Sequence, residues 1–318
     1  MSAAHDDTVL VTGAGGYVGQ RLVKRLVAGD RYRVVAVDLA APTPESRLPG
    51  VEYVALDVRS PRLAEVLGEN AVGSVVHLAA IVTPTADRDL AYSVDVDGSR
   101  NVLDACLEAE VRRLIVTSSG AAYGYHPDNP RWIRETQPLR GNVDFPYAHH
   151  KRLVEEMLAA YRDDHPQLEQ VVFRVATVLG SRTDNEISAL FDRSLLIGVR
   201  GGDDRFVFIW DEDVARCLER ALGDSPAGVY NLAADGAISL KELAVRMRKW
   251  RLALPAGLLR MVLAAGCRLG MTRYGPEQVG FLQYRPVLDN GRLKSVFGFE
   301  PAKNSSEVFD LYVESRSR

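Results

Sequence analysis

The stretch that decides the fold is Val9-Leu10-Val11-Thr12-Gly13-Ala14-Gly15-Gly16-Tyr17-Val18-Gly19. A short apolar strand leads directly into a glycine-rich turn, and an amphipathic helix follows. The spaced glycines leave no Cβ where the turn tightens, where a pyrophosphate approaches the backbone, and where helix meets strand. A glycine turn alone also has a purely structural interpretation. With the signals below, it predicts a dinucleotide site whose contacts are Gly13, Gly16, Tyr17, Val18 and Gly19.

An acidic residue follows each of the next two predicted strands. Asp38 ends Arg33–Asp38, about 20 residues after the last glycine of the turn. A carboxylate there can accept hydrogen bonds from both adenosine ribose hydroxyls and would repel a 2′-phosphate, which favours NAD over NADP. Asp57, followed by Val58, ends the next strand, where it could hold the adenine amino group. The alternative for each acid is a polar residue in a turn.

Strand and helix patterns alternate along the first 180 residues. The expected strands are Thr8–Thr12, Arg33–Asp38, Glu52–Leu56, Ser74–Leu78, Arg113–Thr117 and Gln170–Arg174, and the expected helices are Val18–Ala28, Leu90–Ala109 and Tyr147–Tyr161. Strands that are apolar on both faces are typical of parallel sheets covered by helices on both sides. The sequence therefore predicts an α/β fold with a doubly wound parallel sheet, the Rossmann fold.

The alternation weakens after Gly180, which places a domain boundary there. Strands are expected again at Arg205–Ile209 and Gly228–Leu232, and helices at Leu240–Trp250, Pro255–Leu269 and Ser305–Val313. We expect residues 1–180 to form the NAD-binding domain, with residues 205–235 returning to it. Residues 181–204 and 236–318 should form a smaller, partly helical C-terminal lobe for the substrate.

Composition excludes several classes of protein. Of 318 residues, 47% are hydrophobic and 25% charged, and the net charge is only −3, so a nucleic-acid partner is not expected. The three cysteines are far apart and odd in number, so neither a disulfide framework nor a metal site is predicted. The polar segment Met1–Asp7 does not resemble a signal peptide, and Pro255, Arg260 and Arg268 interrupt the apolar stretch Leu252–Met271. We expect a cytoplasmic protein without a membrane span.

A candidate catalytic pair lies in the helix Tyr147–Tyr161. Tyr147 and Lys151 are four residues apart, so they lie on one face of that helix. A nearby ammonium favours the phenolate form of a tyrosine. Tyr147 could then remove a hydroxyl proton while a hydride leaves the carbinol carbon for NAD. By itself a tyrosine and lysine at this spacing is more often structural, and His149 and His150 between them are expected to be exposed helix residues.

Taken in order, these motifs resemble the extended short-chain dehydrogenase/reductases, the NAD-dependent epimerase/dehydratase family. The resemblance covers roughly residues 8 to 300. The segments that carry it are Thr12–Gly19, Asp38, His77–Ala80, Ser118–Gly124, Tyr147 with Lys151, Arg205–Ala215 and Gly228–Asn231.

The resemblance implies roles for further residues. Ser119 would orient the substrate oxygen beside Tyr147, with Ser118 as the second choice, and Lys151 would also hold the nicotinamide ribose. The cofactor would pass Leu78, Ala79 and Ala80, and its nicotinamide end would lie near Val175 and Val178. The family also implies a homodimer built on a four-helix contact that uses the helices Leu90–Ala109 and Tyr147–Tyr161.

The substrate side departs from the pattern of nucleotide-sugar enzymes. Thr177 replaces an asparagine that commonly helps to hold substrate phosphates, and Ala121 replaces a frequent serine or threonine. Arg205, in contrast, stands where the family often places an arginine on a nucleotide diphosphate, although it could be a surface cation. The apolar stretch Leu254–Leu269, with Tyr274, Phe281 and Tyr284 nearby, suggests a less polar substrate. Ser119, Ala121, Thr177 and Arg205 are the predicted substrate contacts.

Three functions remain open. The first is an NAD-dependent oxidoreductase that acts on a secondary alcohol or ketone and exchanges its cofactor at each turnover. The second is an epimerase or dehydratase of uridine or thymidine diphosphate sugars that keeps NAD tightly bound. The third is a non-catalytic NAD-binding sensor or scaffold, since a fold does not guarantee chemistry.

Overall fold

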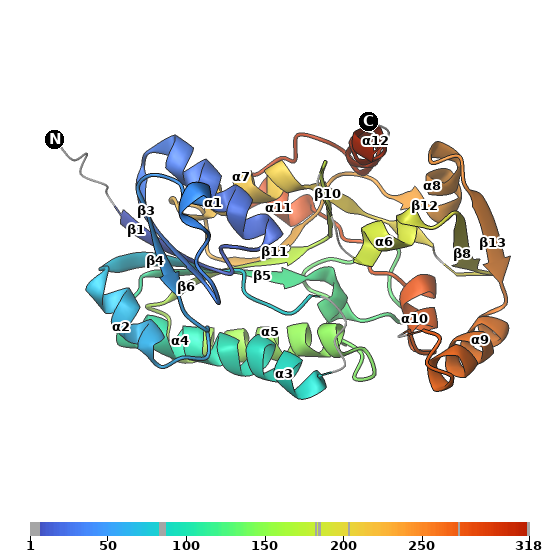
Figure 1. Cartoon of the computed structure of the whole chain (residues 1–318), viewed down its shortest axis with the longest axis horizontal. Helices are drawn as coiled ribbons and strands as arrows, with labels where there is room; N and C mark the ends of the chain where they lie inside the picture. Colours follow the sequence, from blue (N-terminus) through green and yellow to red (C-terminus); the bar gives the residue numbers. More distant parts are fainter. Residues whose placement is uncertain are drawn as a thin grey trace.

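The structure is a computed structural model that describes residues 7–82, 87–181, 183, 186–202, 204–272 and 274–316. Residues 1–6 of the polar N-terminal segment therefore lie outside the described residues. A seven-stranded sheet forms the larger part of the molecule, with strand order β11-β6-β5-β4-β1-β2-β3 (Figure 1). Its strands are β1 (Asp7–Thr12), β2 (Tyr32–Asp38), β3 (Val51–Ala55), β4 (Val72–His77), β5 (Arg113–Ser119), β6 (Glu169–Val175) and β11 (Gly228–Leu232). Every neighbouring pair is parallel.

Helices cover both faces of this sheet. On one face lie α1 (Tyr17–Gly29), α7 (Asp211–Ala221) and α11 (Gly291–Ser295), and on the other lie α2 (Arg62–Glu69), α4 (Gly98–Glu108) and α5 (Pro146–Asp164) (Figure 1). Successive side chains of β1 point to opposite faces of the sheet, so they contribute to both cores. Val9 and Val11 pack in the core under α1 and α7, and Leu10 packs in the core under α2, α4 and α5. The predicted Rossmann fold is thus confirmed.

The stretch expected as one helix, Leu90–Ala109, is a composite. It comprises α3 (Arg88–Tyr92), a π-helical segment (Ser93–Asp97) and α4. Asp95 is buried within the π segment, where its carboxylate accepts a hydrogen bond from the backbone amide of Ile81. A widened turn of this kind re-aims a side chain and is frequent at functional sites.

The remaining elements build the small lobe and the connections to it. They are α6 (Glu186–Asp192), β8 (Leu195–Val199), β9 (Arg205–Phe206), β12 (Ile238–Ser239), α8 (Leu240–Arg246), β13 (Trp250–Leu254), α9 (Ala256–Arg268), α10 (Gln278–Gln283) and α12 (Ser305–Arg316). Strand β7 (Thr177–Leu179) pairs with β10 (Phe208–Trp210) where the chain leaves the large sheet. Short 3-10 turns occupy Pro44–Ser46 and Gly120–Tyr123. Aromatic rings in tilted and edge-on contact with Phe191 form the core of the lobe.

Two elements expected after Gly180 differ in extent from the prediction. The stretch Leu240–Trp250 is helical only to Arg246, because Arg248 adopts a left-handed backbone conformation with φ 54° and the chain turns into β13. The stretch Arg205–Ile209 is divided between β9, which pairs with β12, and β10, which pairs with β7. Tertiary pairing, which local pattern does not encode, decided both outcomes.

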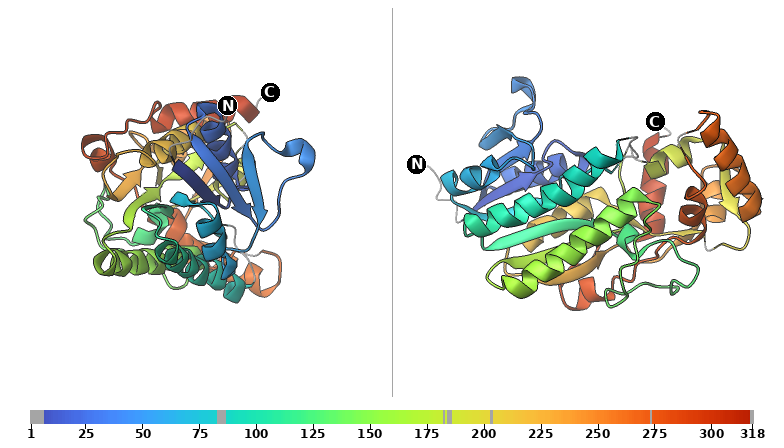
Figure 2. Two further views of the ribbon diagram at one scale, coloured as in Figure 1. Left: turned by 90° about the vertical axis from the view of Figure 1, so that its left-hand side faces the viewer. Right: turned by 90° about the horizontal axis from the view of Figure 1, so that it is seen from below.

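Two surface features bear on the expected dimer and membrane behaviour. Helices α4 and α5 lie side by side on one face of the molecule (Figure 2, right), and the hydroxyl of Tyr161 donates to Asp104 across them at 2.6 Å. The four-helix dimer therefore stays a prediction with a defined surface. Among the described residues, no helix has the length and apolar character needed to cross a bilayer.

Candidate active site

The glycine turn has the shape that a pyrophosphate needs. Gly13 has φ 68°, and a Cβ there would lie 2.7 Å from the backbone nitrogen of Ala79. A Cβ on Gly19 would overlap the carbonyl oxygen of Gly13, and Gly16 precedes the first turn of α1. The turn is therefore closed to larger residues on the inside and presents the amides at the start of α1 outward. These residues fit a dinucleotide.

Tyr17 is hydrogen-bonded to the neighbouring helix α7 and to Thr183. Its hydroxyl donates to the Asp211 carboxylate at the start of α7 and accepts a hydrogen bond of 3.0 Å from Thr183. Burial raises the pKa of Tyr17, so the phenol stays neutral. Arg21 forms an ion pair with the same Asp211 carboxylate at 2.7 Å. These bonds join the starts of α1 and α7 beside the predicted phosphate site.

The two predicted adenosine acids have different surroundings. Asp38 ends β2 next to the glycine turn, and its Oδ2 accepts a hydrogen bond of 2.8 Å from the Gly15 amide. Its other oxygen accepts from the Leu39 amide, which leaves acceptor capacity on both oxygens for ribose hydroxyls. Asp57, beside Val58, forms an ion pair of 2.5 Å with Arg59, which lowers the pKa of Asp57. An adenine amino group would have to share that carboxylate with Arg59.

A buried histidine joins the ends of β1 and β4. His77 contacts Thr12 Oγ1 through Nδ1 at 2.8 Å and Ser99 Oγ through Nε2 at 3.1 Å. Because the hydroxyl of Ser99 donates to the carbonyl oxygen of Asp95, its oxygen must accept from His77, so Nε2 carries the proton and Nδ1 accepts from Thr12. Burial lowers the pKa of His77 to about 3. The neutral ring fixes the strand ends from which Leu78, Ala79 and Ala80 leave.

His150 is not the exposed residue that the sequence predicted. It is buried in α5, and its Nδ1 lies 3.0 Å from Asp95 Oδ2 in the π segment. On the buried side of α5, a hydrogen-bonded polar pair takes the place of apolar side chains here. The sequence pattern of a helix face does not reveal such a pair. His149 is partly exposed and lies near Arg152.

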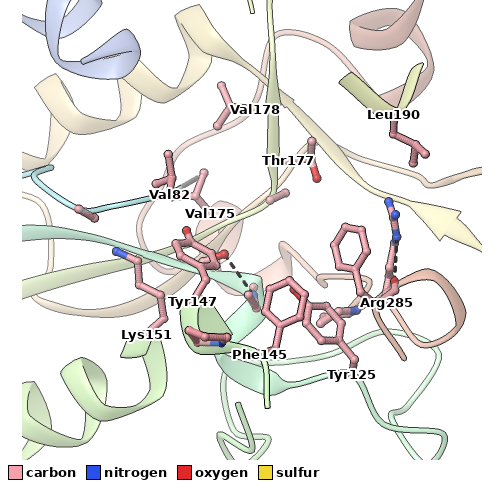
Figure 3. A pocket seen from close by; sticks show the side chains of 18 of the residues that line it. Val82, Tyr125, Phe145, Tyr147, Lys151, Val175, Thr177, Val178, Leu190 and Arg285 are labelled. Atoms are coloured by element: carbon pink, nitrogen blue, oxygen red, sulfur yellow. Dashed lines mark hydrogen bonds between the residues drawn. The ribbon is translucent and has the colours of Figure 1, made fainter. Parts of the chain in front are cut away.

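The predicted catalytic residues meet at one wall of the cavity. Tyr147 lies in the first turn of α5, and the Lys151 ammonium lies 5.7 Å from the centre of its ring (Figure 3). Lys151 Nζ also donates to the carbonyl oxygen of Thr117 at 3.1 Å, which anchors the ammonium to β5. Ser119 ends β5, and its Oγ accepts from the Ala121 amide at 3.1 Å.

The second serine of this strand has another partner. The hydroxyl of Ser118 donates to Glu155, whose carboxylate forms a buried ion pair of 2.7 Å with Arg174. Arg174 also donates to the hydroxyl of Tyr123. Ser118 also lines the cavity, but its hydroxyl proton is donated to Glu155, and this favours Ser119 as the hydroxyl that meets a substrate.

One cavity of about 690 Å³ gathers most of the predicted site. Its wall includes Gly13, Gly16, Tyr17, Val18, Gly19, Leu78, Ala80, Ser119, Ala121, Tyr147, Lys151, Val175, Thr177, Val178 and Arg205. Four predicted cofactor residues, Asp38, Asp57, Val58 and Ala79, are not among the residues that line it. The cavity extends from the glycine turn, past Tyr147, into the small lobe, so a dinucleotide and a substrate can lie end to end.

The lobe end of the cavity is aromatic and contains an arginine that the sequence analysis missed. The rings of Tyr125, Phe145 and Phe281 pack with centres 5.1 to 5.8 Å apart. Figure 3 shows Tyr125 and Phe145 of this group. The Arg285 guanidinium is buried and lies 3.7 Å from the ring centre of Phe206. Its Nε donates to the carbonyl oxygen of Phe281, while its Nη2 has no hydrogen-bond partner in the described part of the chain. Nothing in the local sequence distinguishes Arg285 from a surface arginine.

The two other predicted substrate residues occupy the same cavity in different ways. Thr177 lies in β7 opposite Tyr147 (Figure 3). Arg205 lies over the ring of Trp132 at 5.8 Å and donates to the carbonyl oxygen of Arg131. Part of the Arg205 guanidinium is therefore committed to the protein.

Fold and cavity together define a dinucleotide-binding α/β protein with a tyrosine and lysine pair at its centre. The sequence model of the NAD dependent epimerase/dehydratase family matches residues 9–233. The chain belongs to this family, which confirms the predicted resemblance and NAD as the cofactor.

Three similar proteins illustrate the relationship. An uncharacterized protein of Mycobacterium tuberculosis is 29% identical, with 97% of this chain and 84% of that protein covered. The UDP-glucose 4-epimerase of Mycolicibacterium smegmatis is 30% identical, with 96% and 97% covered. The crystal structure of Thermus thermophilus UDP-glucose 4-epimerase in complex with NAD is 26% identical, with a TM-score of 0.75 and 97% and 98% covered.

Proposed function

We propose that the protein is a nucleotide-sugar epimerase or dehydratase that oxidises a secondary carbinol of the sugar and keeps its nicotinamide cofactor bound. Arg285 carries this proposal, because a buried guanidinium that lines the cavity and forms no salt bridge with any of the described residues calls for an anion. Burial lowers the pKa of Arg285 to about 9, so it remains a cation at neutral pH. The similarity to epimerases of UDP-glucose supports this function better than the free dehydrogenase that the sequence analysis placed first.

The side chains around the carbinol each have a task. Tyr147 removes the hydroxyl proton, and Lys151, held by the carbonyl oxygen of Thr117, keeps a positive charge beside the phenol. Ser119 orients the oxygen that loses its proton. NAD, when bound, accepts the hydride from the carbinol carbon. The aromatic residues Tyr125, Phe145 and Phe281 exclude water from the lobe end of the cavity.

A dehydrogenase of apolar secondary alcohols is the second candidate. The cavity wall favours it at one place, since Leu190, Leu259 and Leu263 face the same space as the aromatic cluster. Such a wall suits an apolar substrate, but an apolar substrate offers no anion to the Arg285 guanidinium. For either function we also propose a cytoplasmic location and a homodimer, as expected from the sequence.

The test is to incubate the enzyme and NAD with uridine and thymidine diphosphate sugars and to identify a changed sugar by chromatography and mass spectrometry. Replacing Tyr147 by Phe should abolish product formation and leave NAD binding intact. Replacing Arg285 by Met should raise KM for the sugar nucleotide roughly tenfold or more while kcat changes less. Product formed equally well by Tyr147→Phe would contradict the assigned chemistry, and an unchanged KM in Arg285→Met would remove the anion site.

A further inference from the structure

Helix α9 exposes an unusual amount of apolar surface. Leu259 is the only residue of α9 that is buried. Leu258, Met261 and Val262 are 43%, 65% and 56% exposed, and Leu269, directly after the helix, is 72% exposed. At 100° per residue, these four side chains and Ala265 fall within about 100° of arc. We call Leu258, Met261, Val262, Ala265 and Leu269 the outer face of α9.

Apolar side chains continue on the flanking segments. Trp250 and Leu252 of β13 are 82% and 44% exposed, and Met271 is 78% exposed. Single exposed apolar residues are common on protein surfaces, but a continuous amphipathic stripe with apolar neighbours marks a binding surface. Figure 1 shows α9 at the end of the small lobe farthest from the N-terminus.

The charges around the outer face are of one sign. Residues 243–276 contain seven lysines and arginines and no aspartate or glutamate, although the whole chain has a net charge of −3. Arg246 and Arg251 form ion pairs with acids outside this segment. Within the described part of the chain, Arg248, Arg260 and Arg268 have no acidic partner. Cations that border an exposed apolar stripe are complementary to an anionic lipid surface.

The other side of α9 belongs to the active-site cavity. Leu259 and Leu263 line it, together with Leu195 and Ile197 of β8. One helix therefore separates the lobe end of the cavity from the outer face. A partner bound to the outer face of α9 would therefore lie one helix away from the end of the cavity that the substrate would occupy.

We propose that α9 and the adjacent part of β13 dock this protein on a membrane that contains anionic phospholipids, with the outer face of α9 inserted at the level of the headgroups. The helix lies on the membrane and does not cross it, since 13 residues extend for about 20 Å against a hydrocarbon thickness of about 30 Å. A second copy of the chain suits this surface less well, because a twofold contact would bring the unpaired arginines of both copies together. Docking presents the lobe end of the cavity to the lipid. The proposal goes beyond the enzymatic function and does not depend on it.

Vesicle binding by the full chain tests the proposal. The protein should co-sediment with vesicles of equimolar phosphatidylcholine and phosphatidylglycerol, and much less with phosphatidylcholine alone. Val262→Glu should abolish binding to the mixed vesicles, and Arg268→Glu, at the border of the outer face of α9, should weaken it by at least about fivefold. Raised salt should weaken binding of the wild-type protein.

A matched control and an insertion probe separate docking from loss of folding. Val296→Glu changes a 46% exposed valine after α11, outside the basic segment, and should leave vesicle binding unchanged. A polarity-sensitive fluorophore on Val262→Cys, in a chain whose exposed Cys267 is replaced by Ser, should shift to shorter wavelength with the mixed vesicles.

Three results would overturn the proposal. The first is no binding of the wild-type protein to the mixed vesicles. The second is equal binding of Val262→Glu. The third is a dimer in analytical ultracentrifugation that Val262→Glu dissociates, which would show that a second copy covers the face. Each of these is measured without substrate, so failure of the enzymatic proposal cannot be confused with failure of docking.

Discussion

Replacing His77 by Gln should make the free energy of unfolding less dependent on pH. In the folded protein, burial, and to a lesser extent the charge of Lys151, lower the pKa of His77 from its ordinary value of 6.5 to about 3. Between about pH 6.5 and about pH 3, His77 therefore binds a proton in the unfolded chain but stays neutral in the folded protein. The stability contributed by the neutral ring is therefore fully present above about pH 6.5 and is lost as the pH falls toward 3.

The size of the effect follows from the gap between the two pKa values. Each pH unit within the gap removes about 1.4 kcal/mol, so lowering the pH from about 7 to about 5 should remove about 2 kcal/mol through His77 alone. Gln keeps a donor and an acceptor on a neutral side chain, so the contacts to Thr12 and Ser99 can be retained in part. The variant should be less stable at neutral pH but should lose about 2 kcal/mol less on acidification.

Urea unfolding at a series of pH values measures this difference. The free energies of the two proteins should converge as the pH falls, since the other titrating groups are common to both. Parallel curves between about pH 7 and about pH 5 would refute the assignment of a buried neutral His77 that joins β1 to β4.

Three further predictions concern the cofactor site and the core. Replacing Asp38 by Ala or Ser should weaken NAD much more than NADP in a binding titration, and an equal loss for both would remove Asp38 from cofactor selection. Gly19→Ala forces a Cβ onto the turn backbone, so it should lower stability by roughly 1–3 kcal/mol and weaken NAD binding in calorimetry. Wild-type behaviour would show that the turn is not tight. Arg174→Met leaves the Glu155 carboxylate buried without its cation and should lower the free energy of unfolding by about 3–5 kcal/mol, whereas a loss below about 1 kcal/mol would show that the ion pair is dispensable.

The nucleotide half of the molecule could be predicted from the sequence because its rules are local. The glycine spacing requires a particular turn, and the acid after β2 follows at a fixed distance along the chain. Apolar strands that must be covered on both faces imply the parallel sheet. Tyr147 and Lys151 follow from the helical period, which places them on one face of α5.

The substrate half depends on long-range contacts that local rules do not encode. Arg285 is a candidate anion site only because Phe206, from a distant strand, packs on it, and His150 is buried where a π segment brings Asp95 to it. The strand β13 forms only because β8 pairs with it, and the sequence pattern alone favoured a helix up to Trp250. In each case the neighbour that changes a residue's role lies far away along the chain.

The most direct test of the proposed function is the absorbance of reduced nicotinamide at catalytic enzyme concentration with excess NAD. Two substrate pools are compared: uridine and thymidine diphosphate sugars, and apolar secondary alcohols including sterols. The proposed function predicts a signal limited to one equivalent per active site with a sugar nucleotide, together with a changed sugar. Reduced cofactor that accumulates over many turnovers with an apolar alcohol would contradict it and establish a dehydrogenase.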